Sequence, residues 1–346
     1  MPYQSTGKCR FYVSILQWLD SLGKLEHLPQ WDYDTENDKN LVRINPASQT
    51  SFVGTGDGTE DNNQQILRYK NTLNTFDKLM PNEQNFFMVL GHNFATTGVK
   101  GLYTKENGNT YSPLAISPYV NWTAGDDTQS ATYDGFSIAV GNNAGDNTTD
   151  SLALYFRHYA NNLTYKLSSF LYGTYWESPF SPDLKLTLGY DTGTKNIETK
   201  GGASLSNTMW RPPMWGDTLG PWELSDPDSP TTGQTLAHSS RRIWKLSFSF
   251  LSQENIFPKY NALNRYANTE DLDSADLLLT EGETLSDSDD FFSQVWNRCT
   301  TALPFIFQPD KDVPEFAICK FTKPISFQQT APGLYQISNL EIREAW

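Results

Sequence analysis

The sequence has few cysteines and few charged residues for its length. Three cysteines, Cys9, Cys299 and Cys319, are spread over 346 residues, and no two of them form a CxxC pair. This spacing excludes the disulfide framework of small secreted domains, so we expect reduced thiols. Charged residues make up only 19% of the chain and aromatic residues 14%, a composition that favours a packed core over a disordered chain.

Basic residues and long apolar runs are also scarce. Lys and Arg number 26 against 40 Asp and Glu, so the net charge of −14 opposes binding to phosphates and argues against a nucleic-acid partner. No segment approaches the roughly 20 apolar residues that span a bilayer, so no membrane partner is expected. The opening residues lack a signal-like apolar core, which predicts synthesis in a cytoplasm.

Signatures of catalysis and of metal binding are missing as well. His27, His92, His158 and His238 stand at no HxxxH or HExxH spacing, and no GxSxG, P-loop or GxGxxG occurs. Acidic stretches match no EF-hand spacing. We therefore expect no enzyme, no cofactor and no metal. A polysaccharide-degrading pair of carboxylates stays open, because the fold sets the separation of such a pair.

Short segments of alternating apolar and polar residues are what the sequence has in abundance. Turn residues separate them, as in Asn-Gly and Asp-Thr-Gly, and this pattern is typical of strands. An apolar run at 85–91 predicts a strand buried on both faces. Further strands are expected at 41–44, 136–140, 152–157, 165–172 and 184–190. The prediction is a mainly β protein with a jelly-roll or β-sandwich domain over residues 1–235.

Residues 212–234, rich in Pro, Trp and Gly, mark the expected domain boundary. Beyond it, alternation over 242–252 predicts a strand with Trp244, Phe248 and Phe250 buried on one face. Asp289 or Asp290 can cap a helix that places Trp296 on the same core. Three closing strands are expected at 304–308, 316–321 and 335–343. The prediction for residues 236–346 is a β-sandwich with one flanking helix.

Two groups of residues are candidates for binding. His92 and Asn93 follow the buried strand, where they could hold a sugar hydroxyl or a catalytic water; the favoured alternative is that they bond the loop backbone and lock the turn. Trp210, Trp215 and Trp222 lie in the boundary stretch. They could stack on sugar rings, anchor a protein partner, or fill the gap between two domains.

An acidic segment, Thr269–Asp290, is the third candidate. It carries nine Asp and Glu residues without one Lys or Arg, among them Asp287, Asp289 and Asp290. Like charges repel, so the segment either stays solvated or docks on a basic surface of a neighbouring subunit. Leu277, Leu278 and Leu279 would be the apolar anchors of such docking.

Several phrases of the sequence are distinctive, namely Arg10-Phe-Tyr-Val, Phe87-Met-Val-Leu-Gly-His-Asn-Phe, Lys200-Gly-Gly-Ala-Ser-Leu-Ser-Asn, Trp210-Arg-Pro and Arg241-Arg-Ile-Trp-Lys-Leu-Ser-Phe. They resemble virion structural proteins of tailed bacteriophages, many of them from marine phages. Near the end, Phe291-Phe-Ser-Gln-Val-Trp-Asn, Pro304-Phe-Ile-Phe-Gln-Pro-Asp and Leu340-Glu-Ile-Arg-Glu-Ala-Trp are similar to the closing strands of minor tail and distal-tail proteins.

The resemblance implies a non-catalytic component of a phage tail, at the tail tip, baseplate or distal tail. Its first domain would resemble galactose-binding modules, and its second the sandwich-plus-helix of ring-forming tail proteins. Such a protein would be made in the host cytoplasm, act as a homo-oligomeric ring in the virion, and contact other tail proteins. The alternative is a module that binds a host surface glycan or receptor.

Overall fold

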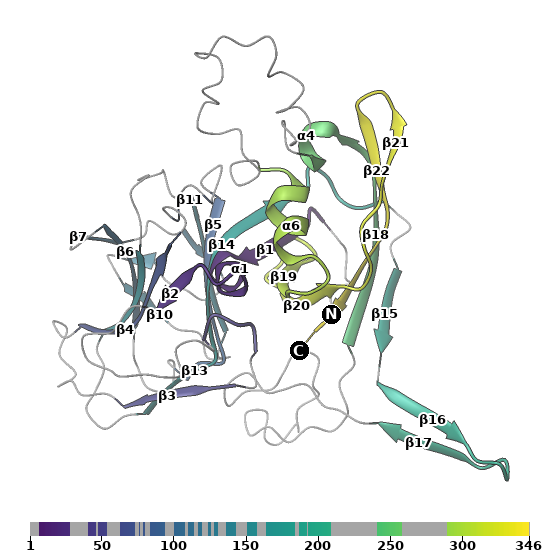
Figure 1. Ribbon diagram of the computed structural model, residues 1–346, viewed down its shortest axis with the longest axis horizontal. Helices are drawn as coiled ribbons and strands as arrows, with labels where there is room; N and C mark the ends of the chain where they lie inside the picture. Colours follow the sequence, from purple (N-terminus) through teal and green to yellow (C-terminus); the bar gives the residue numbers. More distant parts are fainter. Residues whose placement is uncertain are drawn as a thin grey trace.

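Antiparallel strands make up most of the described chain (Figure 1). The computed structural model describes residues 7–27, 41–45, 48–53, 63–72, 76, 79, 84–93, 100–107, 110–113, 117–119, 124–125, 128–130, 136–142, 151–157, 164–183, 187–191, 193–208, 241–257 and 289–345. The prediction of a mainly β fold is confirmed. The jelly-roll topology of the first domain stays a prediction.

The largest sheet has eleven strands in the described chain, and all of its pairings are antiparallel. Its order is β15 (Thr187–Asp191), β18 (Arg241–Ser252), β22 (Leu334–Glu344), β20 (Ala317–Phe321), β19 (Phe305–Gln308), β1 (Arg10–Ser14), β14 (Ser169–Glu177), β5 (Gln84–Leu90), β11 (Phe136–Asn142) and β8 (Ser117–Tyr119), with β21 (Phe327–Ala331) pairing β22.

A second sheet of seven strands and two small two-stranded sheets complete the described strands. The second sheet runs β2 (Leu25–His27), β4 (Asn63–Asn71), β12 (Ser151–Arg157), β6 (Lys100–Asn107), β10 (Thr128–Ser130) and β9 (Ala124–Gly125), with β7 (Thr110–Pro113) on β6. The small sheets pair β13 (Thr164–Leu167) with β3 (Thr50–Val53), and β16 (Thr194–Glu198) with β17 (Ser204–Thr208).

One core lies between the two large sheets. Phe87 and Phe170 of the largest sheet cluster there with Tyr69 and Leu152 of the second sheet. Helix α1 (Ile15–Ser21) contributes buried apolar residues to the same cluster. Burial of apolar side chains between two layers is the main stabilising term of a sandwich.

A second core covers the same face of the largest sheet toward its other end. The short helical segments η3 (Phe292–Trp296) and α6 (Asn297–Cys299) pack on it. Phe291 stacks edge-on against Phe11 of β1 and against Trp176 of β14, with ring centroids 5.4 Å and 4.9 Å apart. The predicted flanking helix is therefore present at the predicted place, but Trp296, which was expected in the core, is only partly buried against the cluster.

The corner between β1 and α1 explains how the chain turns from one core to the other. Ser14 ends the strand and caps the helix, because its side chain accepts a hydrogen bond from the Gln17 amide. At the other end of the helix, Gly23 adopts a φ of 65°, and the amide of Lys24 bonds back to the carbonyl of Leu19. This is a Schellman ending, which requires a left-handed residue and favours glycine.

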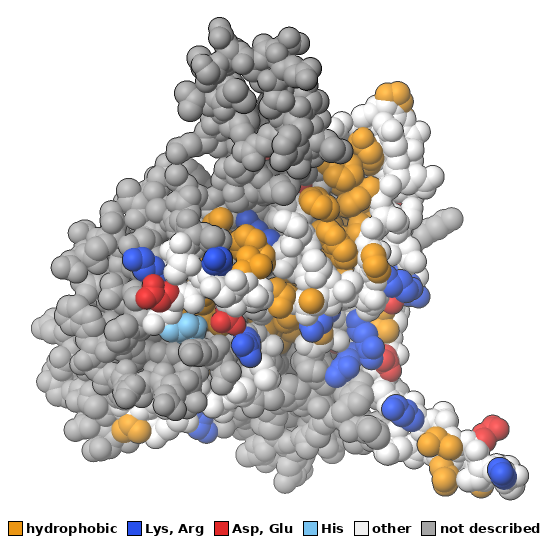
Figure 2. All heavy atoms as spheres, in the orientation of Figure 1, with side chains coloured by type: hydrophobic (Ala, Val, Ile, Leu, Met, Phe, Trp, Pro, Cys, Tyr) orange, Lys and Arg blue, Asp and Glu red, His pale blue; other side chains and the backbone are white. Residues whose placement is uncertain are grey.

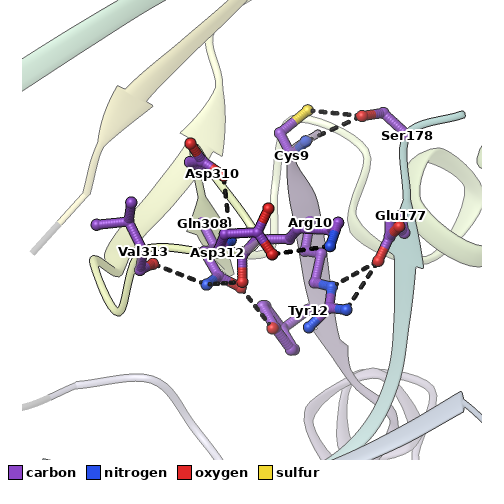
Figure 3. A network of polar contacts seen from close by, with 10 residues as sticks. Cys9, Arg10, Tyr12, Glu177, Ser178, Gln308, Asp310, Asp312 and Val313 are labelled. Atoms are coloured by element: carbon purple, nitrogen blue, oxygen red, sulfur yellow. Dashed lines mark hydrogen bonds and ion pairs between the residues drawn. The ribbon is translucent and has the colours of Figure 1, made fainter. Parts of the chain in front are cut away.

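Polar contacts tie β1 to its two neighbours (Figure 3). Arg10 faces Glu177 of β14 with an N–O distance of 2.8 Å, and the guanidinium also lies over the Tyr175 ring. On the other side, the Tyr12 hydroxyl donates to Gln308 of β19 at 2.7 Å. Because the Gln308 amide in turn donates to the carbonyls of 311 and 313, the loop after β19 is fixed to the same network.

Strands from both predicted domains lie in this one sheet. β1 and β14 belong to residues 1–235, whereas β19, which pairs with β1, belongs to 236–346. The core beside α6 likewise combines residues from both parts. The boundary at 235 stays a prediction, since 209–240 lie outside the described residues, but the two parts share a sheet and a core.

Three local predictions differ from the structure. Residues 41–44 form a turn with buried Leu41 and Val42, so the strand expected there is absent from this described stretch. The strand expected over 165–172 is divided at Ser168 between β13 and β14, which pair with different partners. β21, which is mostly polar and exposed, was not predicted.

Candidate assembly surface

The structure assigns His92 and Asn93 to the support of the fold. His92 is 2% exposed, its Nε2 lies 2.8 Å from the Ser137 hydroxyl of β11, and burial lowers its pKa to about 3. The Asn93 side chain donates to the Thr164 carbonyl and accepts from the Lys166 amide, so it bonds β13 as a strand residue would. The favoured interpretation had the pair bonding the loop backbone; instead, His92 contacts a side chain of β11 and Asn93 bonds the backbone of the strand β13.

The two described residues of the acidic segment have different roles. Asp289 is exposed, whereas Asp290 is 1% exposed and its Oδ1 accepts from the Ser293 amide at 2.9 Å. Asp290 is thus the predicted helix cap, and it does not present its carboxylate to a neighbouring subunit. Trp210, Trp215, Trp222, Leu277, Leu278, Leu279 and Asp287 lie outside the described residues.

A two-stranded hairpin projects from the body of the molecule; we call this hairpin, residues 194–208, the arm (Figure 1). It follows directly on β15, the strand at one end of the largest sheet. At its base Gly193, with a φ of 65°, donates its amide to the Asp191 carboxylate. At its tip the Gly202 amide bonds the Thr199 carbonyl, and Gly202 has a φ of 80°. These turns define the hairpin at both ends.

The arm exposes an apolar pair. Ile197 and Leu205 are directly opposite in the register, and they are 64% and 59% exposed. Figure 2 shows hydrophobic side chains together along the arm. Every residue of 194–207 is exposed, so no core of the body supports this hairpin. Since a lone two-stranded hairpin is marginally stable in water, a partner that covers the pair would stabilise it.

The prediction that Phe250 is buried was wrong. Alternation placed it in the core with Trp244 and Phe248, which are each 1% exposed, but Phe250 is 73% exposed. The register of β18 against β22 shifts between Phe248 and Leu251, and Phe250 has a φ of 64°. A bulge therefore adds one residue and turns the ring outward. A bulky residue at positive φ is strained, which makes this ring a candidate contact.

The outer face of β18, β20 and β22, turned away from the helix, carries five cationic side chains. We call this the basic face: Arg241, Lys245, Lys320, Lys323 and Arg343. Lys245, Lys323 and Arg343 have side chains that are 50%, 59% and 37% exposed. Figure 2 shows Lys and Arg side chains gathered over β15 and the start of β18.

Among the described residues, fewer carboxylates than cations lie on this face. Asp191 pairs with Arg343, and Glu341 lies 3.1 Å from Lys323 and 3.7 Å from Lys245. A third, Asp183, bonds Ser249 near the far end of β18. Burial lowers the pKa of Arg241, and the charge of Arg343 lowers it further. The described part of this face therefore holds more cations than carboxylates, in a chain of net charge −14.

Sequence reasoning missed both the arm and the basic face. The arm has one apolar residue in each strand, so alternation could not reveal it; its only signals are the turn phrases at 191–193 and 199–202. The basic face combines three segments far apart in the sequence. Each of its lysines and arginines, taken alone, is typical of a solvent-exposed position on a strand.

The described residues bear on metal binding and on membrane crossing. They include no group of three His, Cys, Asp or Glu side chains that could hold a metal ion. None of the described helices is both long and apolar enough to cross a membrane. No protein-family model matches the chain, and neither a curated protein nor a solved structure matches it.

Proposed function

We propose that this chain is a non-catalytic structural component of a bacteriophage tail, working as a symmetric homo-oligomer in assembly at the tail tip, baseplate or distal tail. The observation that carries the oligomer is the arm, an exposed hairpin with an apolar pair, which extends from the end strand of a large sheet. The phrases that resemble tail proteins support the assignment of the chain to a virion. A closed ring would cover each arm without open-ended aggregation.

Arm contacts should contribute measurably to assembly. Covering most of the exposed surface of one Ile and one Leu contributes about 3 kcal/mol per arm, by the usual value for apolar burial. Light scattering of the parent protein over a concentration series should show a single closed oligomer. The double substitution Ile197→Ser and Leu205→Ser should shift it toward monomer. The unfolding midpoint of the monomer, measured at concentrations where parent and variant are both dissociated, should not change, because these side chains support no core.

The matched control replaces two other exposed apolar residues, Leu22→Ser and Val53→Ser, which are 50% and 51% exposed and lie off the arm. It should assemble like the parent. A parent protein that is monomeric at every concentration contradicts the oligomer. An oligomer unaffected by the arm substitutions contradicts the role of the arm. The phage assignment has its own test: a frame of tape-measure length among the neighbouring genes supports it, and a setting without tail genes contradicts it.

Phe250 favours a second candidate, a module that binds a host glycan or receptor. Its ring is 73% exposed and held out by a strained bulge, and aromatic rings exposed in this way stack on sugars. A glycan array probes this directly. Reproducible binding that is lost on Phe250→Ala and kept in the Leu22→Ser control would support the second candidate, and an array without binding would contradict it.

A further inference from the structure

We propose that the basic face receives the acidic segment, Thr269–Asp290, of a second copy of this chain. The proposal rests on the proposed oligomer and names the contact that joins one copy to the next. Charge complementarity carries it. The face has a surplus of cations, whereas the segment has nine carboxylates and no Lys or Arg. Asp290 does not take part in this docking, since its carboxylate caps the helix.

The charges of the face are arranged to attract an anionic chain. Lys245 lies opposite Glu341 in the register, and Lys320 lies opposite Arg343, so cations from three strands adjoin one another. Glu341 pairs with both Lys245 and Lys323, so among the described residues these two cations share one carboxylate. Arg343 lowers the pKa of Arg241, as a neighbouring positive charge does, whereas Asp191 and Glu344 raise it.

The described residues on either side of the segment favour a second copy. On the N-terminal side, Phe257 packs against Phe327 and Tyr335, with ring centroids 4.9 Å and 5.3 Å apart. On the C-terminal side, Phe291 packs in the same core. Phe257 and Phe291 therefore both lie on the helix side of the sheet, opposite to the basic face. From there the chain reaches its own basic face only around the edge of the sheet, so we take the docked segment to come from a neighbouring copy.

Each copy gives a segment and receives one. Two copies can do this reciprocally about a two-fold axis, and more copies can do it head-to-tail in a ring when the rotation between copies closes. The arm extends from β15, the strand next to the basic face, so the two surfaces adjoin and one neighbour could cover both. The electrostatic part should weaken with salt, since the Debye length falls from about 10 Å at 0.1 M to about 3 Å at 1 M.

The experiment uses the full chain and measures the dissociation constant of the oligomer across a salt series. The face variant carries Lys245→Glu and Lys323→Glu, and the segment variant carries Glu281→Lys and Glu283→Lys. The control, Lys8→Glu and Lys24→Glu, makes the same charge change at exposed positions elsewhere. We expect each of the first two variants to weaken assembly at least tenfold at low salt and the control to leave it unchanged.

Mixing the two variants shows whether the basic face binds the segment of a neighbouring copy or the segment of its own copy. An equimolar mixture of the face and segment variants pairs opposite charges only between copies, so assembly should be restored. If the mixture stays dissociated while a chain carrying all four substitutions assembles, the docked segment belongs to the same copy, and the proposal of a second copy is overturned. The neutral pair Lys245→Gln and Lys323→Gln repeats the test if reversal beside Glu341 disturbs the fold. An oligomer indifferent to salt and to every variant overturns this proposal alone, whereas a parent that never assembles overturns the proposed function.

Discussion

The buried ion pair between Arg242 and Glu344 allows a quantitative test of the fold. Both side chains are 1% exposed. The Arg242 Nε donates to the Glu344 carboxylate at 2.8 Å, and the guanidinium lies 4.9 Å from the centre of the Trp244 ring. A second carboxylate, Glu315, lies 3.1 Å away but is 31% exposed. The pair joins the start of β18 to the end of β22 across the core.

Glu344→Gln keeps the shape of the side chain and removes its charge. Loss of one partner from a buried pair usually costs 3–5 kcal/mol, because the remaining charge stays buried. Since Glu315 and the Trp244 ring still face the guanidinium, we expect a loss of about 3 kcal/mol, at the lower end of that range. Urea unfolding followed by tryptophan fluorescence measures it.

Two comparisons test the reasoning. Asp312→Asn removes a carboxylate that also pairs with a cation, Lys311, but is 75% exposed, so it should cost under about 0.5 kcal/mol. The double substitution Arg242→Met and Glu344→Leu removes both charges and should recover most of the loss. A cost below about 1 kcal/mol for Glu344→Gln, or a double variant less stable than the single one, would refute the account of an uncompensated buried charge.

Three further predictions follow from single buried groups. His92 stays neutral in the fold because burial lowers its pKa to about 3, while the same side chain in the unfolded chain takes up a proton below about pH 6.5. The free energy of unfolding should therefore be full above pH 6.5 and fall by about 2 kcal/mol at pH 5. In unfolding measured against pH, His92→Gln should flatten this slope, and an unchanged slope would show that His92 is protonated in the fold. Arg298→Ala should cost about 3 kcal/mol in urea unfolding, since the buried guanidinium bonds Thr174 and the Leu79 carbonyl; a loss under 1 kcal/mol would contradict that role. Gly173→Ala should prevent folding because its Cβ would lie 2.0 Å from the Val13 carbonyl oxygen, whereas Gly189→Ala, whose Cβ would have its nearest neighbour at 3.9 Å, should be tolerated. Circular dichroism and soluble yield compare the two variants. Equal behaviour would contradict the close approach at Gly173.

Patterns that depend on one segment alone could be predicted from the sequence. The apolar run at 85–91 became β5, which is buried on both faces, and Asp290 became the cap of the helix that covers the second core. Both follow from local chemistry, namely the apolar content of a strand and the hydrogen-bonding capacity of a carboxylate at a helix start. The strand at 242–252 was also expected, and its even-numbered residues up to Phe248 face the core.

Features that depend on two distant segments could not be predicted. Phe250 turns outward because of the bulge against β22, a strand about ninety residues away in sequence, where Asn339 also has positive φ. Alternation within β18 carries no sign of it. The same limit applies to the basic face, since Lys320 and Arg343 become neighbours only through the pairing of β20 with β22.

The place of β1 in the sheet has a consequence for synthesis. Tyr12 bonds Gln308 across 296 residues of sequence, and β1 pairs with β19 along one side and with β14 along the other. At the usual rate of 5–20 residues per second, a ribosome takes roughly 15–60 s to make the chain between these two strands. During that interval one edge of β1 has no β19 to pair with. A ribosome stalled before residue 305 would therefore hold a nascent chain with an open, apolar strand edge, and such chains should be the ones that chaperones engage or that aggregate.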